Sequence, residues 1–146
     1  MSNLAMDAKN RVAIAAKQGI EAVVRAMGAH ESSTGVQERG CSALVNLAAK
    51  NLENKVAIVE TGGIEAVVRA MAAHQWCAVE VQEVGCRALH NIVLWGSGLG
   101  SHVREADAVT FVKKALPAFP YDWVLQTRGR VFLMKLGARP RPRCFF

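Results

Sequence analysis

The chain has 146 residues, of which 51% are hydrophobic and 6% aromatic, enough to bury the core of one domain. Its net charge of +6 belongs to the C-terminal segment. Residues 1–122 hold 12 basic and 12 acidic residues, whereas residues 123–146 hold six basic residues and no acid. The neutral body disfavours nucleic acid as the partner of the domain. Without a run of about 18 apolar residues, the chain is not expected to span a membrane.

The nonapeptide GIEAVVRAM occurs twice, at residues 19–27 and at residues 63–71. The flanking segments repeat as well. RVAI at 11–14 returns as KVAI at 55–58, and VQERGCSALVNLA at 36–48 returns as VQEVGCRALHNIV at 81–93. The same structural unit is therefore expected twice, with a period of about 44 residues, in the range of three-helix repeats.

A weaker third copy follows, with ADAVTFVKKALPAF at 106–119 and LQTRGRVFLMKL at 125–136. The chain thus predicts a repeat domain over residues 1–137, with units at about 6–50, 51–95 and 101–137. Residues 138–146 form a basic tail rich in Pro and Arg, which we expect to be disordered.

The apolar residues of GIEAVVRAM fall at i, i+3, i+4 and i+7, which is one face of an α-helix. A short helical segment precedes this one and a longer segment follows it. Each unit is therefore predicted to contain a short, a middle and a long helix. Gly19 and the pair Gly62–Gly63 are expected to separate the short helix from the middle helix.

Two residue types recur at the same place in the long segment of each unit, and the glycines among them stand on its apolar stripe. They are Gly40, Gly85 and Gly129, and Gln37, Gln82 and Gln126. Glycine inside a helix costs about 1 kcal/mol relative to alanine. A close approach of another helix is the expected reason for these glycines.

The segment NKVAIVETGGIEAVVRAM…VQEVGCRALHNI resembles the armadillo repeat. It shares the opening Asn, the Ile-x-x-x-Gly-Gly-Ile turn and the ALxNL ending, seen here as SALVNLA and RALHNIV. The resemblance covers almost the whole chain, in two strong units and one weaker unit. It implies an all-α fold, an armadillo-type α-solenoid, which is a right-handed superhelix of three-helix repeats that bury each other's apolar faces.

The resemblance also implies a groove, lined by the long helices, that takes an extended peptide. At about 100° per residue, a polar stripe runs beside the apolar stripe of each long helix. The armadillo pattern assigns the clamping of a peptide backbone to the Asn of ALxNL, here Asn46 and Asn91, whereas Lys135 takes that place in the third unit. The candidate peptide-binding residues on the stripe are Asn46, Asn91, Arg39, Ser42, Arg87, Arg128 and Lys135.

The stripe departs from importin-α, an armadillo protein that places Trp one turn before this Asn to hold basic peptides. The corresponding residues here are Ser42, Arg87 and Val131. The basic side chains of the stripe would repel a basic ligand, so we expect an acidic or phosphorylated extended segment. Two alternatives remain: an intramolecular cap or a solvated amide for Asn46 and Asn91, and a solvated surface for Arg87.

No nucleophile–base pair, phosphate-binding loop or pair of catalytic carboxylates is evident, so an enzyme is not expected and no cofactor is implied. GSGLGS at 96–101 follows no strand and is expected to be a linker. The predicted function is a protein–protein interaction scaffold. Two alternatives stay open: polyanion binding through the basic C-terminal segment, and a structural fragment of a longer armadillo array.

The cysteines indicate a reduced environment, since none forms a Cys-x-x-Cys pair and no signal peptide is evident. A cytoplasmic location is expected, with the nucleus as the alternative. Four side chains could suggest a zinc site: His74, Cys77, Cys86 and His90. Two of them, His74 and Cys86, only repeat His30 and Cys41 of the first unit, so no metal is expected.

Three units meet only the minimum for a stable stack, and no polar capping repeat is evident in the sequence. Incompletely covered layers are therefore expected at both ends. The residues predicted to lie near them are Val12, Ile14, Ile20, Phe132 and Leu133. Self-association through these uncapped ends is a further expectation.

Overall fold

The computed structural model describes residues 7–16, 18–93 and 98–138. These residues form nine α-helices and no strand, which confirms the predicted all-α class. The helices are α1 (Ala8–Ala16), α2 (Gly19–Ala29), α3 (Thr34–Ala48), α4 (Leu52–Glu60), α5 (Gly63–Ala73), α6 (Val79–Val93), α7 (Gly100–Glu105), α8 (Ala108–Ala118) and α9 (Trp123–Lys135). The predicted order of short, middle and long helix is confirmed in all three units.

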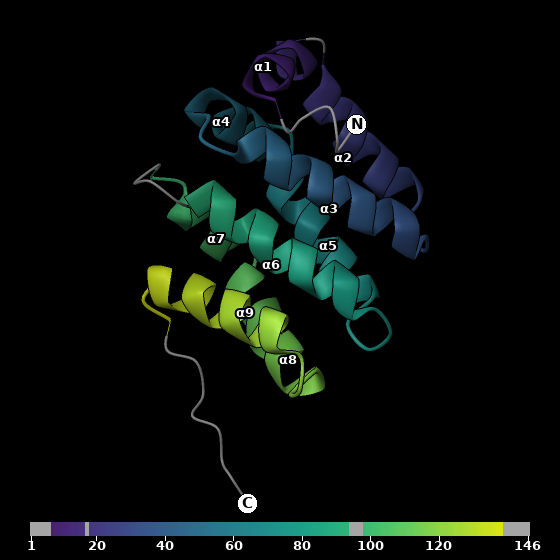
Figure 1. Cartoon of the computed structure of the whole chain (residues 1–146), viewed down its shortest axis with the longest axis vertical. Coiled ribbons are helices and arrows are strands. Elements are labelled where there is room, and N and C mark those ends of the chain that lie inside the picture. The colour runs from purple at the N-terminus through teal and green to yellow at the C-terminus, as the bar shows by residue number, and fades with distance from the viewer. Residues whose placement is uncertain (1–6, 17, 94–97, 139–146) are drawn as a thin grey trace, which may run out of the picture.

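The units follow one another along the long axis of the molecule (Figure 1). We call them unit 1 (α1–α3), unit 2 (α4–α6) and unit 3 (α7–α9). The long helices form one layer, in which α3 packs on α6 and α6 packs on α9. The middle helices form a second layer, in which α2 contacts α5 and α5 contacts α8. Each unit thus presents its long helix on one side and its middle helix on the other.

Glycine brings the long and the middle helix of each unit close together. A Cβ atom at Gly85 would lie 2.6 Å from Cγ of Met71, and one at Gly129 would lie 2.8 Å from Cδ2 of Leu116. Gly40 faces Met27 in the same way. The close approach predicted for these glycines is confirmed.

The turn between the short and the middle helix differs from the prediction at Gly19. The left-handed residue is the one before it, Gln18 with φ 58°, and its counterpart in unit 2 is Gly62 with φ 77°. Gly63 already belongs to α5, where a Cβ atom would lie 2.6 Å from Cγ2 and 2.7 Å from the carbonyl oxygen of Ile58. Glycine at this second position is therefore required for contact with the short helix rather than for the turn.

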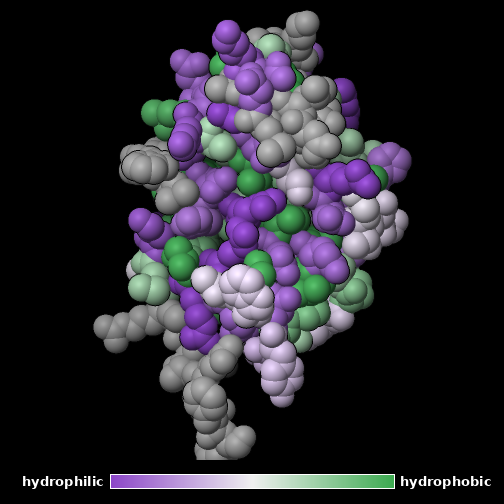
Figure 2. Space-filling view, viewed as in Figure 1, coloured by the Kyte–Doolittle hydropathy of each residue, from purple (hydrophilic) through white to green (hydrophobic). Residues whose placement is uncertain are grey.

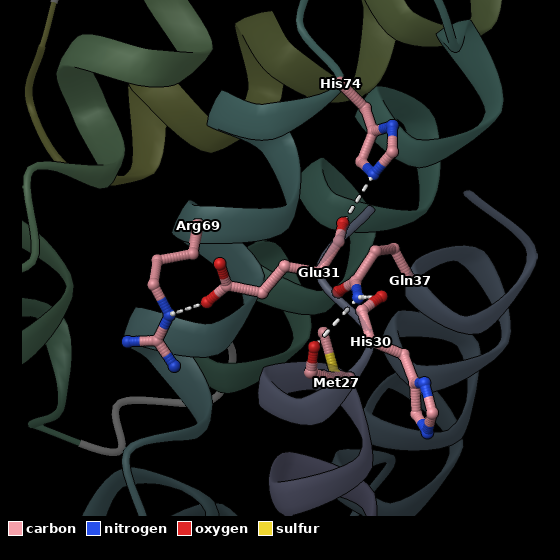
Figure 3. A network of polar contacts seen from close by, with 6 residues as sticks. All are labelled: Met27, His30, Glu31, Gln37, Arg69 and His74. Atoms are coloured by element: carbon pink, nitrogen blue, oxygen red, sulfur yellow. Dashed lines mark hydrogen bonds and ion pairs between the residues drawn. The ribbon is translucent and has the colours of Figure 1, made fainter. Parts of the chain in front are cut away.

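The repeated glutamine of each long helix is buried and binds the C-terminal end of the middle helix. Gln37 Nε2 donates to the carbonyl oxygens of Met27 (2.9 Å) and His30 (2.8 Å) (Figure 3). Gln82 Nε2 donates to Met71 O at 2.8 Å, and Gln126 Nε2 makes the matching bond in unit 3. The carbonyls at the end of a helix have no partner within the helix, so the glutamine satisfies them in the core.

We expect Gln82→Met to lower the free energy of unfolding by about 1–3 kcal/mol, because the buried Met71 carbonyl would lose its partner. Urea denaturation followed by circular dichroism measures the change. Gln75→Met is the matched control, since Gln75 is half-buried in the turn between α5 and α6. Equal stability of the two variants would contradict the role given to Gln82.

Three of the residues expected near uncovered layers are buried, so that prediction is wrong for them. Ile20 is 1% exposed, and both Phe132 and Leu133 are fully buried. Phe132 lies on α9, which packs on both α6 and α8. Val12 is exposed as expected, and Ile14 is half-buried.

Two segments with predicted irregular structure fall only partly within the described residues. In the predicted linker 96–101, residues 96 and 97 lie outside them, whereas Gly100 and Ser101 already begin α7. In the predicted tail, residues 139–146 lie outside them, and Ala138 donates its N–H to Leu133 O at 2.8 Å. No helix within the described ranges has the length and apolar character needed to cross a bilayer.

Candidate functional site

The layer of long helices brings the predicted peptide-binding residues onto neighbouring elements. Arg39, Ser42 and Asn46 lie on α3, Arg87 and Asn91 on α6, and Arg128 and Lys135 on α9. Arg39 and Lys135 are exposed and the other five are half-buried. The face that contains this layer carries hydrophilic side chains across its middle, with hydrophobic ones between them (Figure 2).

Asn91 ties two long helices together. Its Nδ2 donates to the carbonyl oxygen of Val45 at 3.2 Å, from α6 to α3. The intramolecular alternative considered for this amide is thus present. The bond uses one of two amide hydrogens, so the second hydrogen and the amide oxygen remain for a ligand.

Arg87 is the most unusual basic residue of the layer. It is half-buried, and its Nε atom is buried without a hydrogen-bond partner among the described residues. Burial lowers the pKa of Arg87, and the nearby charge of Arg128 lowers it further, while Glu83 opposes both. The guanidinium is partly desolvated, which costs free energy, and because Nε is buried a surface anion could contact Arg87 only through its terminal nitrogens.

His90 extends the basic character one turn further along α6, and the sequence analysis did not assign it to the site. Its Nε2 atom is buried and has no hydrogen-bond partner within the part of the chain that the structure describes. Burial lowers the pKa of His90, and the charges of Lys135, Arg128 and Lys55 lower it further. A signal was present in the sequence, because the matching residues in the other units are the apolar Val45 and Met134. We call Arg87, His90, Arg128 and Lys135 the basic cluster.

Two acidic side chains near the basic cluster, Glu83 of α6 and Asp122, influence each other. Burial raises the pKa of Glu83, and the nearby Asp122 raises it further. Asp122 also caps α9, since its Oδ1 accepts from Leu125 N at 2.7 Å. The ion pairs found within the described ranges are Arg69–Glu31 and His102–Glu105, and neither contains a member of the cluster.

The side chains considered for a zinc site have other surroundings. His74 Nε2 donates to the carbonyl oxygen of Glu31 at 2.9 Å, across the junction of units 1 and 2 (Figure 3). Cys86 is buried, and burial raises the pKa of its thiol to about 12, whereas Cys77 is exposed. Within the described residues, no three His, Cys, Asp or Glu side chains are grouped so that they could hold a metal ion.

A hollow of about 260 Å³ is present at the end of unit 1 rather than on the layer of long helices. Arg39 lines it together with Ala22 and Ala26 of α2 and with Gly40 and Ala43 of α3. Arg39 therefore faces the end of the stack, away from the basic cluster.

Comparison with protein-family models, with curated proteins and with solved structures finds no match to this chain.

Proposed function

We propose that the chain is a protein–protein interaction module, an armadillo-type α-solenoid that binds an extended acidic or phosphorylated segment of another protein across α3, α6 and α9. The repeated three-helix units and the layer of long helices support the solenoid. The observation that carries the binding function is the half-buried Arg87, a partly desolvated cation beside the like charge of Arg128. Binding of a segment rather than chemistry on a substrate is the proposed activity, in the cytoplasm or the nucleus.

A carboxylate or phosphate of the ligand would accept hydrogen bonds from the Arg87 guanidinium, a charge-assisted contact that is stronger than a neutral one. The exposed Lys135 would provide a further donor. Packed helices lie about 8–10 Å apart, so α3 to α9 spans about 16–20 Å. An extended chain rises about 3.3 Å per residue, and about six residues would therefore cross the layer.

Three labelled peptides of about twelve residues, long enough to cross the layer, test this proposal by fluorescence anisotropy. They share a Gly/Ser/Ala frame and carry glutamates, phosphoserines or lysines at the same positions. We expect the two acidic peptides to bind and the lysine peptide not to bind. The double variant Arg87→Ala/Lys135→Ala should lose this binding. Retained binding by that variant, or equal binding of the lysine peptide, would contradict the proposal.

The same peptides distinguish the proposed function from the main alternative, polyanion binding through the basic tail. A chain that ends at Ala138 lacks Arg139, Arg141 and Arg143. If acidic ligands bind through the layer of long helices, this truncated chain should keep the affinity of the full chain. Loss of binding on truncation would instead assign polyanion binding to the basic tail.

We expect the glutamate peptide to bind more tightly as the pH falls from about 8 to about 6, the range in which histidine titrates. In the free protein, burial and the neighbouring cations lower the pKa of His90. A carboxylate beside His90 would raise that pKa, so binding takes up a proton in the pH interval between the two values. Isothermal titration calorimetry over this range measures the effect, and His90→Gln should remove it.

The contribution of His90 to the free energy of unfolding should fall as the pH falls, whereas peptide affinity should rise. A folded-state pKa below the unfolded value means that the unfolded chain binds the proton more readily. The contribution of neutral His90 is therefore present above the unfolded pKa and is lost as the pH falls. A parallel rise of melting temperature and peptide affinity on acidification would contradict this assignment.

A further inference from the structure

The end of unit 1 exposes a surface that is covered in the other two units. In unit 2 the side chains at these positions are buried; for example, Ala66 and Ala70 are each 2% exposed. They lie beside Met27, Gly28 and Glu31 of unit 1. The matching residues of unit 1 are Ala22, which is half-buried, and Ala26, which is exposed. Both line the open hollow of about 260 Å³. We call this surface the end face; it comprises Ala22, Ala26, Val36, Arg39, Gly40 and Ala43.

The opposite end of the stack carries basic side chains, as does the border of the end face, so the two ends are not complementary in charge. The position of Val24 and Val68 is taken by Lys113 in unit 3, which is exposed. The position of the buried Cys41 and Cys86 is taken by Arg130, which is half-buried. The exposed Arg25 lies at the border of the end face. Head-to-tail stacking of two copies would therefore oppose basic side chains to basic side chains.

Two exposed side chains of opposite charge, Glu21 and Arg25, border the end face. Arg69 of unit 2, which matches Arg25, reaches across to Glu31 of unit 1, with 3.6 Å between Nε and Oε1 (Figure 3). Position 25 therefore points toward whatever packs on the end face. Glu21 lies one turn before Arg25 on α2, and both are exposed. When two α2 helices pack antiparallel about a two-fold axis, Glu21 of each lies opposite Arg25 of the other.

Small residues make this contact sterically feasible. Ala22 and Ala26 on α2, with Gly40 and Ala43 on α3, leave room for the close approach of another helix. We propose that the end face binds the end face of a second copy of this chain, giving a two-fold symmetric dimer. Such a contact is isologous and closes after two subunits. The proposal is independent of the peptide-binding function.

Sedimentation of the full chain at concentrations from about 1 to about 100 μM tests the dimer, a range that brackets affinities near 10 μM. We expect dimers in the wild type and an at least tenfold weaker association for Ala26→Arg. Ala73→Arg makes the same change at an exposed position of α5 outside the end face, and it should leave association unchanged. Circular dichroism verifies that each variant keeps its helical content.

The charge pair provides a second test that does not depend on a bulky substitution. Glu21→Arg and Arg25→Glu should each weaken the dimer, because each places like charges opposite one another. The double variant Glu21→Arg/Arg25→Glu should restore it. A monomeric wild type over the whole concentration range, or a dimer unaffected by both Ala26→Arg and the single charge variants, would overturn the proposal.

Discussion

Arg87→Glu is expected to weaken binding of an acidic peptide by about 30-fold to several thousand-fold. Removing one partner of a buried, hydrogen-bonded charge pair costs about 2–5 kcal/mol, which corresponds to that range of affinity. The reversed charge would also repel the ligand directly. Arg87 is the member of the basic cluster expected to contribute most to binding, because it is half-buried beside the like charge of Arg128. Fluorescence anisotropy with the glutamate peptide gives the affinity.

Lys113→Glu provides the matched control for this prediction. It changes the net charge by the same amount at an exposed residue of α8, outside the layer of long helices. We expect it to alter affinity only slightly, through long-range electrostatics that added salt suppresses. Equal losses for the two variants would mean that the overall charge of the domain, rather than the basic cluster, attracts the peptide.

Phe132→Ala is expected to produce the largest loss of stability, about 3–5 kcal/mol, because it would leave a cavity where a large buried aromatic side chain stood. Phe132 is fully buried in α9. Its unit has the weakest repeat pattern in the sequence, yet its long helix packs on α6 and carries Arg128 and Lys135. Chemical denaturation followed by circular dichroism measures the change.

Met134→Ala serves as the comparison, since Met134 is 70% exposed on the same helix. It should change stability by no more than about 0.5 kcal/mol, as is usual for surface positions. If Phe132→Ala cost as little as Met134→Ala, unit 3 would not be part of the cooperative structure. The basic cluster would then lack the support of α9.

The repeat made the helices and their order predictable, because the apolar spacing and the identical segments carry that information directly. The glycines that allow close approach were also predictable, since Gly85 stands on an apolar stripe where only a steric reason fits. The role of Gln82 was not, because its partner is a backbone carbonyl and backbone atoms leave no trace in the sequence. The recurrence of glutamine at this repeat position indicated only that the position is constrained.

Burial at the ends of the stack was predicted poorly for the same kind of reason. Ile20 and Phe132 belong to the end units, but whether a side chain faces its own unit or the next depends on three-dimensional packing. The basic cluster was predicted in part: the stripe identified Arg87, Arg128 and Lys135. His90 was missed because it lies on the neighbouring stripe, where the other units carry apolar residues. A comparison of residue character at each repeat position would have identified it.

A ¹⁵N-resolved NMR titration of the full chain with the glutamate peptide tests the central claim most directly. The amide signals of α6 and α9 around Arg87, Asn91 and Arg128 should shift on binding, together with those on the same side of α3. The signals of α2, α5 and α8 should stay in place. Shifts confined to the middle helices, or to residues beyond Ala138, would show that the ligand binds elsewhere and would contradict a peptide-binding surface on the long helices.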